Sequence, residues 1–472
     1  MNGRYSVQQC TKETAEGRIM FKKYKKADFL SGDIFLPMIQ FAIPLLFSTL
    51  FQQLYNTIDT LIVGRTLGEA ALAAIGASSP IYDMLIGFAL GFGNGLAIVT
   101  ARCFGSRDEK MLKDSAAAAM VIGVAVVAMI TLLSQVVLMP LLQILHTPEE
   151  VIGEAYRYIS IITRYTLVMF AYNLCAGLLR AIGNSLMPLI FLIISSFANI
   201  VLDYVFIVVM GRGLGGAAEA TAIAQGISVL LCLIYIAKAV PILIPKKENF
   251  KVDMPLYKEM TAQGFSTAFM MCFVSIGSVI LQSGINGLGY LTIAAHTAAR
   301  KLYSFCMMPF TAMNQTVNTF VSQNYGAGQP GRIRKAMKYS YLYNAAVTVI
   351  ITIVIWSFAP TMIRWLSGSD EEVLLRNGTW YLRVVAPCYF ILGVLNNTRR
   401  ALQAIGQKIL PVFSSVIELV GKIVFTAYFI PKMQYTAVII CEPIIWCFMV
   451  VELLVVFWRD PFIRDGKSEN QT

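Results

Sequence analysis

Residues 180–188 read Arg-Ala-Ile-Gly-Asn-Ser-Leu-Met-Pro, and residues 403–411 read Gln-Ala-Ile-Gly-Gln-Lys-Ile-Leu-Pro. The two stretches share Ala-Ile-Gly and the closing proline at a shift of 223 positions. Further identical pairs, at this shift or at one of 221, are Tyr158 and Tyr381, Asn173 and Asn396, and Gly68 and Gly289. Because both copies lie in hydrophobic sequence, we expect a membrane protein of two homologous halves. Such duplication is typical of secondary transporters.

Composition supports a location in the lipid bilayer. Hydrophobic residues make up 57% of the 472 positions and charged residues only 14%, against about 25% charged residues in soluble domains. The net charge of +11 does not indicate nucleic acid, because most Lys and Arg lie in the two termini and in alternate loops. The opposite loops carry Arg65, Arg212, Arg364, Arg376 and Lys432. The positive-inside rule therefore predicts a multi-pass plasma-membrane protein with both termini in the cytoplasm.

Twelve apolar stretches are long enough to cross the hydrocarbon, which takes about 20 residues of helix. They span residues 35–62, 70–100, 115–138, 154–179, 186–210, 217–238, 256–285, 291–322, 337–358, 377–402, 408–430 and 436–458. We therefore predict an all-α integral membrane fold of twelve transmembrane helices in two pseudo-symmetric six-helix lobes. The predicted parts are a cytoplasmic arm 1–34, an N-lobe 35–238, a cytoplasmic linker 239–255, a C-lobe 256–458 and a cytoplasmic tail 459–472. We expect a monomer.

Several kinds of chemistry lack support in the sequence. The nine cysteines form no Cys-x-x-Cys pair and there are only two histidines, so neither a metal centre nor a disulfide framework is predicted. No Ser/His, Cys/His or His-Glu-x-x-His arrangement indicates an enzyme. The glycine-rich strings at 211–216 and 326–331 join apolar helices and follow no strand, so they are interpreted as turns. His296 is interpreted as a histidine at a helix interface.

Ionisable groups inside apolar spans are costly in lipid and are therefore candidates for function. Glu418 and Lys422 are four residues apart on one span, so we expect them to neutralise each other. Arg300 and Lys301 either bind a carboxylate across the lobe or lie in a wet cavity. Glu442 is, with Glu418, a secondary acid candidate.

Two acids of the first half stand out by their depth. Asp59 lies about four residues, roughly 6 Å, from the outer end of the first span. Asp203 lies in the fifth span, with Asn199 one turn deeper on the same face. Tyr158 and Thr221 fall near the same level in the neighbouring spans. Such oxygen-rich groups suit a hard cation such as Na⁺ or a carboxyl that holds a proton.

The duplication shows that this set is one-sided. At the same shifts Asp59 aligns with Ile280, Asp203 with Thr426 and Asn199 with Lys422. Carboxylates needed only for packing would be expected in both halves. The asymmetry favours an ion site in the first lobe alone, over the alternative that Asp59 and Asp203 merely bond neighbouring helices.

At these residues the chain resembles the multidrug and toxic compound extrusion (MATE) family. The resemblance rests on Leu-Tyr-Asn-Thr-Ile-Asp at 54–59, Asn-Gly at 94–95, the motif at 180–188, Asn-Ile-Val-Leu-Asp at 199–203, and Asn-Tyr-Gly at 324–326. It implies an antiporter that expels organic, often cationic, compounds in exchange for Na⁺ or H⁺. The ion site of the archaeal and DinF-like branch matches Tyr158, Asn199, Asp203, Thr221 and Asp59. Acids that another branch carries in spans 7 and 10 are not matched here.

The leading hypothesis is thus an antiporter for small organic cations, with no cofactor other than the coupling ion. A cavity lined by soft side chains would receive the substrate; its candidates are Met84, Tyr303, Met307, Met308 and Met313. The alternative is a flippase or exporter of lipid-linked saccharides. Its phosphates would require internal Arg or Lys, for which Arg300, Lys301 and Arg383 leave room.

Overall fold

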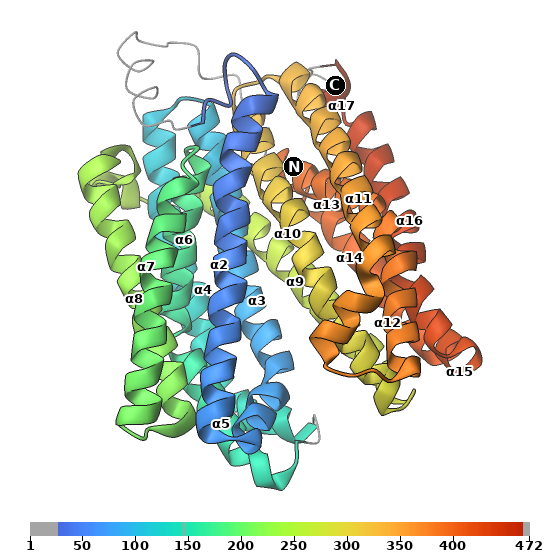
Figure 1. The fold of residues 1–472 in the computed structure, drawn as a ribbon. Coiled ribbons are helices and arrows are strands. Elements are labelled where there is room, and N and C mark those ends of the chain that lie inside the picture. Colours follow the sequence, from blue (N-terminus) through green and yellow to red (C-terminus); the bar gives the residue numbers. More distant parts are fainter. Residues whose placement is uncertain (1–26, 145–146, 466–472) are drawn as a thin grey trace. The chain divides into compact units, whose positions relative to one another are not determined.

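The computed structural model describes residues 27–144 and 147–465, and this part of the chain is helical without β-strands (Figure 1). The predicted N-terminal arm lies mostly outside the described residues, as does the end of the C-terminal tail. Within these described residues, ten helices are long and apolar enough to cross a membrane, or eleven if α5 and α6 form one bent span. The all-α membrane fold predicted from the sequence is therefore confirmed.

The first half of the chain forms seven long helices. They are α2 (Phe35–Leu67), α3 (Glu69–Gly105), α4 (Glu109–Ile144), α5 (Glu149–Arg164), α6 (Thr166–Ala181), α7 (Leu186–Asp203) and α8 (Gly213–Ala239). A π-helical turn, η2 (Tyr204–Val209), continues α7. Two short 3-10 turns, η3 (Pro241–Leu243) and η4 (Lys247–Phe250), lead to the second half.

The second half has the same pattern of elements. It contains α9 (Met254–Asn286), α10 (Tyr290–Gly326), α11 (Pro330–Ser367), α12 (Glu372–Val385), η5 (Ala386–Cys388), α13 (Tyr389–Ala404), α14 (Ile409–Val424), η6 (Phe425–Phe429), α15 (Ile430–Met433), α16 (Tyr435–Arg459) and α17 (Pro461–Asp465). The twelve apolar stretches lie within these helices and bent pairs to within a residue. The long helix α10 falls outside the ten because polar side chains such as His296, Arg300 and Lys301 lower its hydropathy.

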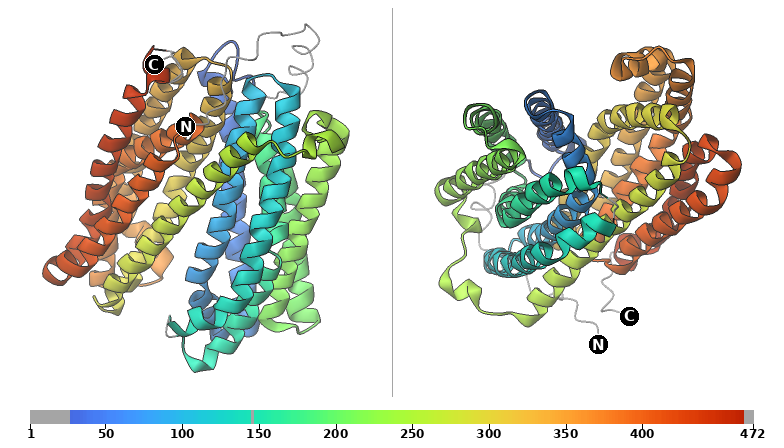
Figure 2. Two further views of the ribbon diagram at one scale, coloured as in Figure 1. Left: turned by 180° about the vertical axis from the view of Figure 1, so that it is seen from behind. Right: turned by 90° about the horizontal axis from the view of Figure 1, so that it is seen from below.

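The described chain divides into two compact units. The first holds Ile43–Cys272 and includes α3 to α8 with most of α2; the second holds Phe273–Tyr325 and Gln329 onward. The helix α9 contributes its first part to the first unit and its second part to the second unit. Figure 2 shows the helices of each unit running side by side. The lobe boundaries proposed from the sequence, 238 and 256, stay a prediction.

Small residues allow close packing inside the first unit. A Cβ atom on Gly95 of α3 would lie 2.5 Å from the backbone oxygen of Gln263 in α9, and one on Gly91 would lie 3.0 Å from the backbone at Thr267. The two glycines are four residues apart and so present one smooth face to α9. Conversely, the ring of Phe92 on α3 fills the space beside Gly264 of α9. Helices that lack a hydrophobic driving force in lipid associate through such close contact.

Equivalent positions of the two halves share unusual backbone geometry. Gly183 and Gly406 of the repeated motif have φ angles of 88° and 101°, and Gly68 and Gly289 have φ angles of 83° and 88°. L side chains rarely adopt this region, so these turns require glycine. Both halves also carry a π turn at the corresponding place, η2 and η6. The duplication found in the sequence thus extends to local structure.

Candidate ion-coupling site

Asp59 and Asp203 come together inside the first unit. Asp59 lies on α2, and Asp203 is the last residue of α7 before the π turn η2. Their carboxyl groups are close enough to share a hydrogen bond if one of them carries a proton. Asp203 is fully buried, and among residues 27–144 and 147–465 neither of its oxygens has a hydrogen-bond donor; the same holds for Asp59 Oδ1. Because each carboxylate only accepts hydrogen bonds, neither satisfies the other unless a proton or a cation lies between them.

The other predicted residues surround this pair. Tyr158 of α5 lies near enough to interact electrostatically with both carboxylates. Asn199, one turn before Asp203, and Thr221 of α8 line a cavity of about 10 Å³, which is close to the minimum that one water or ion needs. Both polar side-chain atoms of Asn199 are buried, and neither has a hydrogen-bond partner among the residues that the structure describes. The structure thus gathers all five predicted residues in one region of the first unit.

Two further residues belong to this region and were not predicted as site residues. Tyr55 lies one turn before Asp59 on α2, lines the same small cavity and interacts electrostatically with both acids. Gln225 lies one turn after Thr221 on α8, and its Oε1 atom is buried without a partner. The sequence signal that could have identified them is their spacing of four residues from a predicted residue, which places both residues of each pair on the same helix face.

The arrangement concentrates oxygen atoms that no protein donor satisfies. Buried polar groups are almost always paired in folded proteins, so each orphan needs an explanation. Carboxylate, amide and hydroxyl oxygens are the ligands that Na⁺ prefers, and a carboxyl pair can equally hold one proton. The site therefore has the composition to take up a hard cation or a proton.

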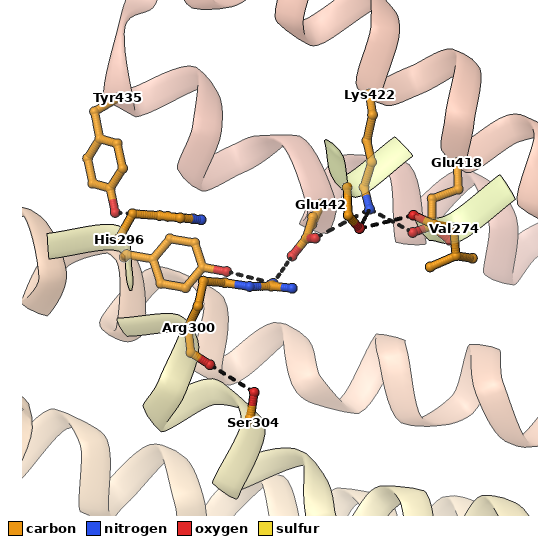
Figure 3. Close-up of polar contacts among 10 residues, drawn as sticks. Val274, His296, Arg300, Ser304, Glu418, Lys422, Tyr435 and Glu442 are labelled. Atoms are coloured by element: carbon orange, nitrogen blue, oxygen red, sulfur yellow. Dashed lines mark hydrogen bonds and ion pairs between the residues drawn. The ribbon is translucent and has the colours of Figure 1, made fainter. Parts of the chain in front are cut away.

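The acid candidates of the second unit are paired with basic residues instead (Figure 3). Lys422 Nζ lies 2.9 Å from Glu418 Oε1 and 3.6 Å from Glu442 Oε1, and Arg300 Nη1 lies 3.0 Å from Glu442 Oε2. Arg399 Nη2 lies 3.9 Å from Glu418 Oε2. The pairing expected for Glu418 and Lys422 is present. Arg300 has both of its predicted environments, because it contacts a carboxylate across the unit and also lines a cavity together with Lys301.

His296 lies at a helix interface, as interpreted from the sequence. Its Nδ1 atom lies 3.3 Å from the hydroxyl of Tyr435, and its ring packs edge-on against Tyr381. The hydroxyl of Tyr381 in turn accepts a hydrogen bond of 3.3 Å from Arg300. The histidine thus belongs to the polar interior of the second unit.

The predicted substrate-lining residues are not gathered in one described cavity. Met84 belongs to the first unit, and the other four belong to the second. Met308 and Met313 are buried, and Tyr303 stacks under Arg300 with 4.4 Å from its ring centre to the guanidinium carbon. Neither of the two described cavities, the small one beside Asn199 or a larger one in the second unit, is lined by these five residues.

The fold and the buried carboxylates define a class, that of all-α integral membrane proteins built from duplicated helical repeats. The sequence profile of the MatE family matches residues 44–205 and 266–428. The chain therefore belongs to the MatE family, and it is a membrane transporter and not an enzyme.

Individual relatives agree with this assignment. A probable multidrug resistance protein of Bacillus subtilis, YpnP, is 29% identical over 392 residues, which cover 81% of this chain and 86% of the relative. A second, YoeA, is 24% identical and covers 97% of this chain and 98% of the relative. A crystal structure of MATE in the bent conformation superposes with a TM-score of 0.84 at 21% identity, covering 98% and 100% of the two chains. The family resemblance inferred from the motifs is confirmed.

Proposed function

We propose that this protein is a secondary active multidrug exporter of the plasma membrane, which expels organic and often cationic compounds in exchange for Na⁺ or H⁺. The observation that carries the proposal is the Asp59–Asp203 pair with its buried, unpartnered oxygens. The names of the relatives support the substrate class: two are probable multidrug resistance proteins, and a third, from Staphylococcus aureus, is a multidrug export protein, MepA. We further propose that both termini lie in the cytoplasm.

The coupling follows from electrostatics. Two carboxylates that approach each other in a buried place repel one another unless a cation or proton neutralises them. Ion binding draws Asp59 of α2 and Asp203 of α7 together, and ion release leaves negative charge that attracts a cationic substrate. Ion and substrate then favour different states of the protein, which is what antiport requires. The π turn after Asp203 supplies a place where α7 can adjust, since such turns are frequent at functional sites.

Transport under separately imposed gradients tests this proposal. Everted membrane vesicles that contain the protein should accumulate ethidium when either a Na⁺ gradient or a pH gradient is imposed alone. Vesicles from cells without the protein provide the baseline. Accumulation no greater than that baseline under both gradients would contradict the proposed function, and the gradient that drives uptake identifies the coupling ion.

The second candidate is an exporter of lipid-linked saccharides. The observation in its favour is the pair of cations, Arg300 and Lys301, that line the larger cavity of the second unit. Glu442 lines the same cavity, however, and its carboxylate is 3.0 Å from Arg300. A diphosphate would have to approach this acid, so we favour the first candidate.

A further inference from the structure

The second unit contains a cavity of about 320 Å³ whose walls are rich in polar groups. Its size falls at the lower end of the range for small-molecule sites, about 300–1,000 Å³. The helices α9, α10, α12 and α16 line it, and its charged members are Arg300, Lys301 and Glu442. Hydroxyl and amide groups complete the wall, among them Ser278, Gln282 and Ser304. The site residues of the first unit play no part in it.

The guanidinium of Arg300 is held in place by several contacts, but some of its N–H groups remain free to donate hydrogen bonds. Its Nη1 atom donates to Glu442 and to the hydroxyl of Tyr381, and Tyr303 covers one face of the group. Within the described part of the chain, Nη2 and Nε make no hydrogen bond. Side-chain exposure of 36% leaves this edge accessible. An arginine held in this way is pre-organised to donate two parallel hydrogen bonds to a planar carboxylate.

Lys301 adds a second positive charge to the same wall. It is exposed within a predicted membrane span, and across residues 27–144 and 147–465 no acid forms an ion pair with it. A charged side chain in such a place is costly unless it faces water or a ligand. The neighbouring Lys422 cannot serve the same purpose, because it is almost fully buried between Glu418 and Glu442.

Charge balance indicates what the cavity accepts. With the histidine neutral, the lining carries two positive charges and one negative charge, which leaves a surplus of one. A single carboxylate neutralises that surplus, whereas a phosphate dianion would add an uncompensated negative charge near Glu442. We propose that this cavity is a binding subsite for the carboxylate of a small organic substrate, held by Arg300 and Lys301. The inference rests on the proposed export function, because it adds compounds that carry a carboxylate to the substrates of that function.

A matched pair of dyes tests the subsite by binding alone. Rhodamine 110 carries a free carboxyl group, and rhodamine 123 is its methyl ester, so the two differ at the group in question. Fluorescence anisotropy with the purified full-length protein should show tighter binding of rhodamine 110. Lys301→Gln should weaken rhodamine 110 about tenfold, as expected for loss of a charge-assisted contact, and should leave rhodamine 123 within about twofold. Lys301→Arg should retain the preference.

The control removes the same charge elsewhere in the second unit. Lys432 lies over the ring of Tyr428 and is not among the residues that line the cavity, so Lys432→Gln should leave the binding of both dyes unaffected. Equal affinity of the wild-type protein for the two dyes would overturn the proposal. So would an equal effect of Lys301→Gln on both dyes. The wild-type comparison decides the matter even if the variant does not fold.

Two further measurements distinguish a lipid occupant from a small molecule and the subsite from the export function. A lipid headgroup as the occupant would appear as displacement of rhodamine 110 by phosphatidylglycerol but not by phosphatidylcholine, and that result would overturn a small-molecule substrate. Ethidium accumulation, measured separately in vesicles, tests the export function. If ethidium is transported but the two rhodamines bind equally well, the subsite proposal is wrong and the export function stands. If rhodamine 110 binds more tightly but ethidium is not transported, the subsite is supported and the export function is wrong.

Discussion

The two halves of this transporter place opposite chemistry at equivalent positions of one duplicated scaffold. In the first unit Tyr158 lies beside two acids that no basic residue in the described part of the chain neutralises. In the second unit the equivalent Tyr381 accepts a hydrogen bond from Arg300. The position of Asn199 is taken by Lys422, which is paired with two glutamates. The comparison indicates that the first unit leaves the charge of its Asp59–Asp203 pair to be balanced by a ligand, whereas in the second unit basic residues balance the charges of Glu418 and Glu442.

This difference has an energetic basis. Removing a charge from water costs several kcal/mol, and a buried ion pair recovers it only with good geometry. The chain of contacts from Arg399 through Glu418, Lys422 and Glu442 to Arg300 alternates in charge, so Glu418 and Glu442 each lie between two basic groups. The Asp59–Asp203 pair has no such neighbours among its described contacts. Glu418 and Glu442 of the second unit are therefore expected to be structural, and Asp59 and Asp203 of the first unit functional.

The largest effect on activity is expected from Asp59→Asn. The amide keeps the shape of the side chain but removes the charge that attracts the ion, so ethidium accumulation should fall to the level of protein-free vesicles. Expression and membrane insertion should be unchanged. The matched control is Glu219→Gln, which removes an acid of the same unit that pairs with Arg212. Wild-type transport by Asp59→Asn would show that this acid has no part in coupling.

The largest effect on stability is expected from Lys422→Met in the second unit. The change leaves Glu418 and Glu442 short of a partner in a buried place, which should cost about 3–5 kcal/mol of unfolding free energy. Unfolding of the purified protein in micelles by a denaturing detergent measures this loss. The double variant Glu418→Gln/Lys422→Met should recover part of it, and Lys432→Met on the surface should cost little. If Lys422→Met leaves the unfolding free energy unchanged, the ion pairs of Glu418 and Glu442 do not stabilise the second unit, and the proposed difference from the Asp59–Asp203 pair is wrong.

A smaller effect on stability is expected where α3 meets α9. The Cβ of Gly95→Ala would lie 2.5 Å from the Gln263 backbone oxygen, so the helices must separate. Overpacking of this kind costs about 1–3 kcal/mol. Gly76→Ala, on the same helix with no atom within 4 Å of the added carbon, is the control and should not destabilise. Equal stability of the two variants in the same unfolding assay would contradict the close contact.

The smallest effect is expected from Tyr55→Phe in the ion site. Loss of one hydroxyl beside the acids should weaken ion binding by about fivefold, the value of one hydrogen bond of about 1 kcal/mol. Tyr156→Phe removes a hydroxyl from α5 in the same unit and serves as the control. Isothermal titration with the coupling ion measures both. If the two variants bind the ion equally well, Tyr55 is not part of the site.

How much of this could be read from the sequence depends on whether an interaction lies within one helix or between helices. Helical spacing paired Glu418 with Lys422, and depth along the spans placed Asp59 and Asp203 at one level. Neither spacing nor depth gives the rotation of a helix about its axis. The contact of Arg399 with Glu418 therefore escaped prediction. Tyr55 and Gln225 were missed for another reason: each lies four residues from a predicted site residue on the same helix, and this spacing was not used. The larger cavity also could not be predicted from the sequence, because its lining residues come from four separate helices.

The measurement that tests the central claim most directly is the affinity for ethidium with and without the coupling ion. Negative coupling between two ligands is typically about 1–3 kcal/mol, so saturating ion should weaken ethidium binding by about 5- to 150-fold in the wild-type protein. We expect Asp203→Asn to abolish most of this difference while the protein remains folded. If Asp203→Asn retains the full wild-type difference, the carboxylate pair is structural and the coupling lies elsewhere in the molecule.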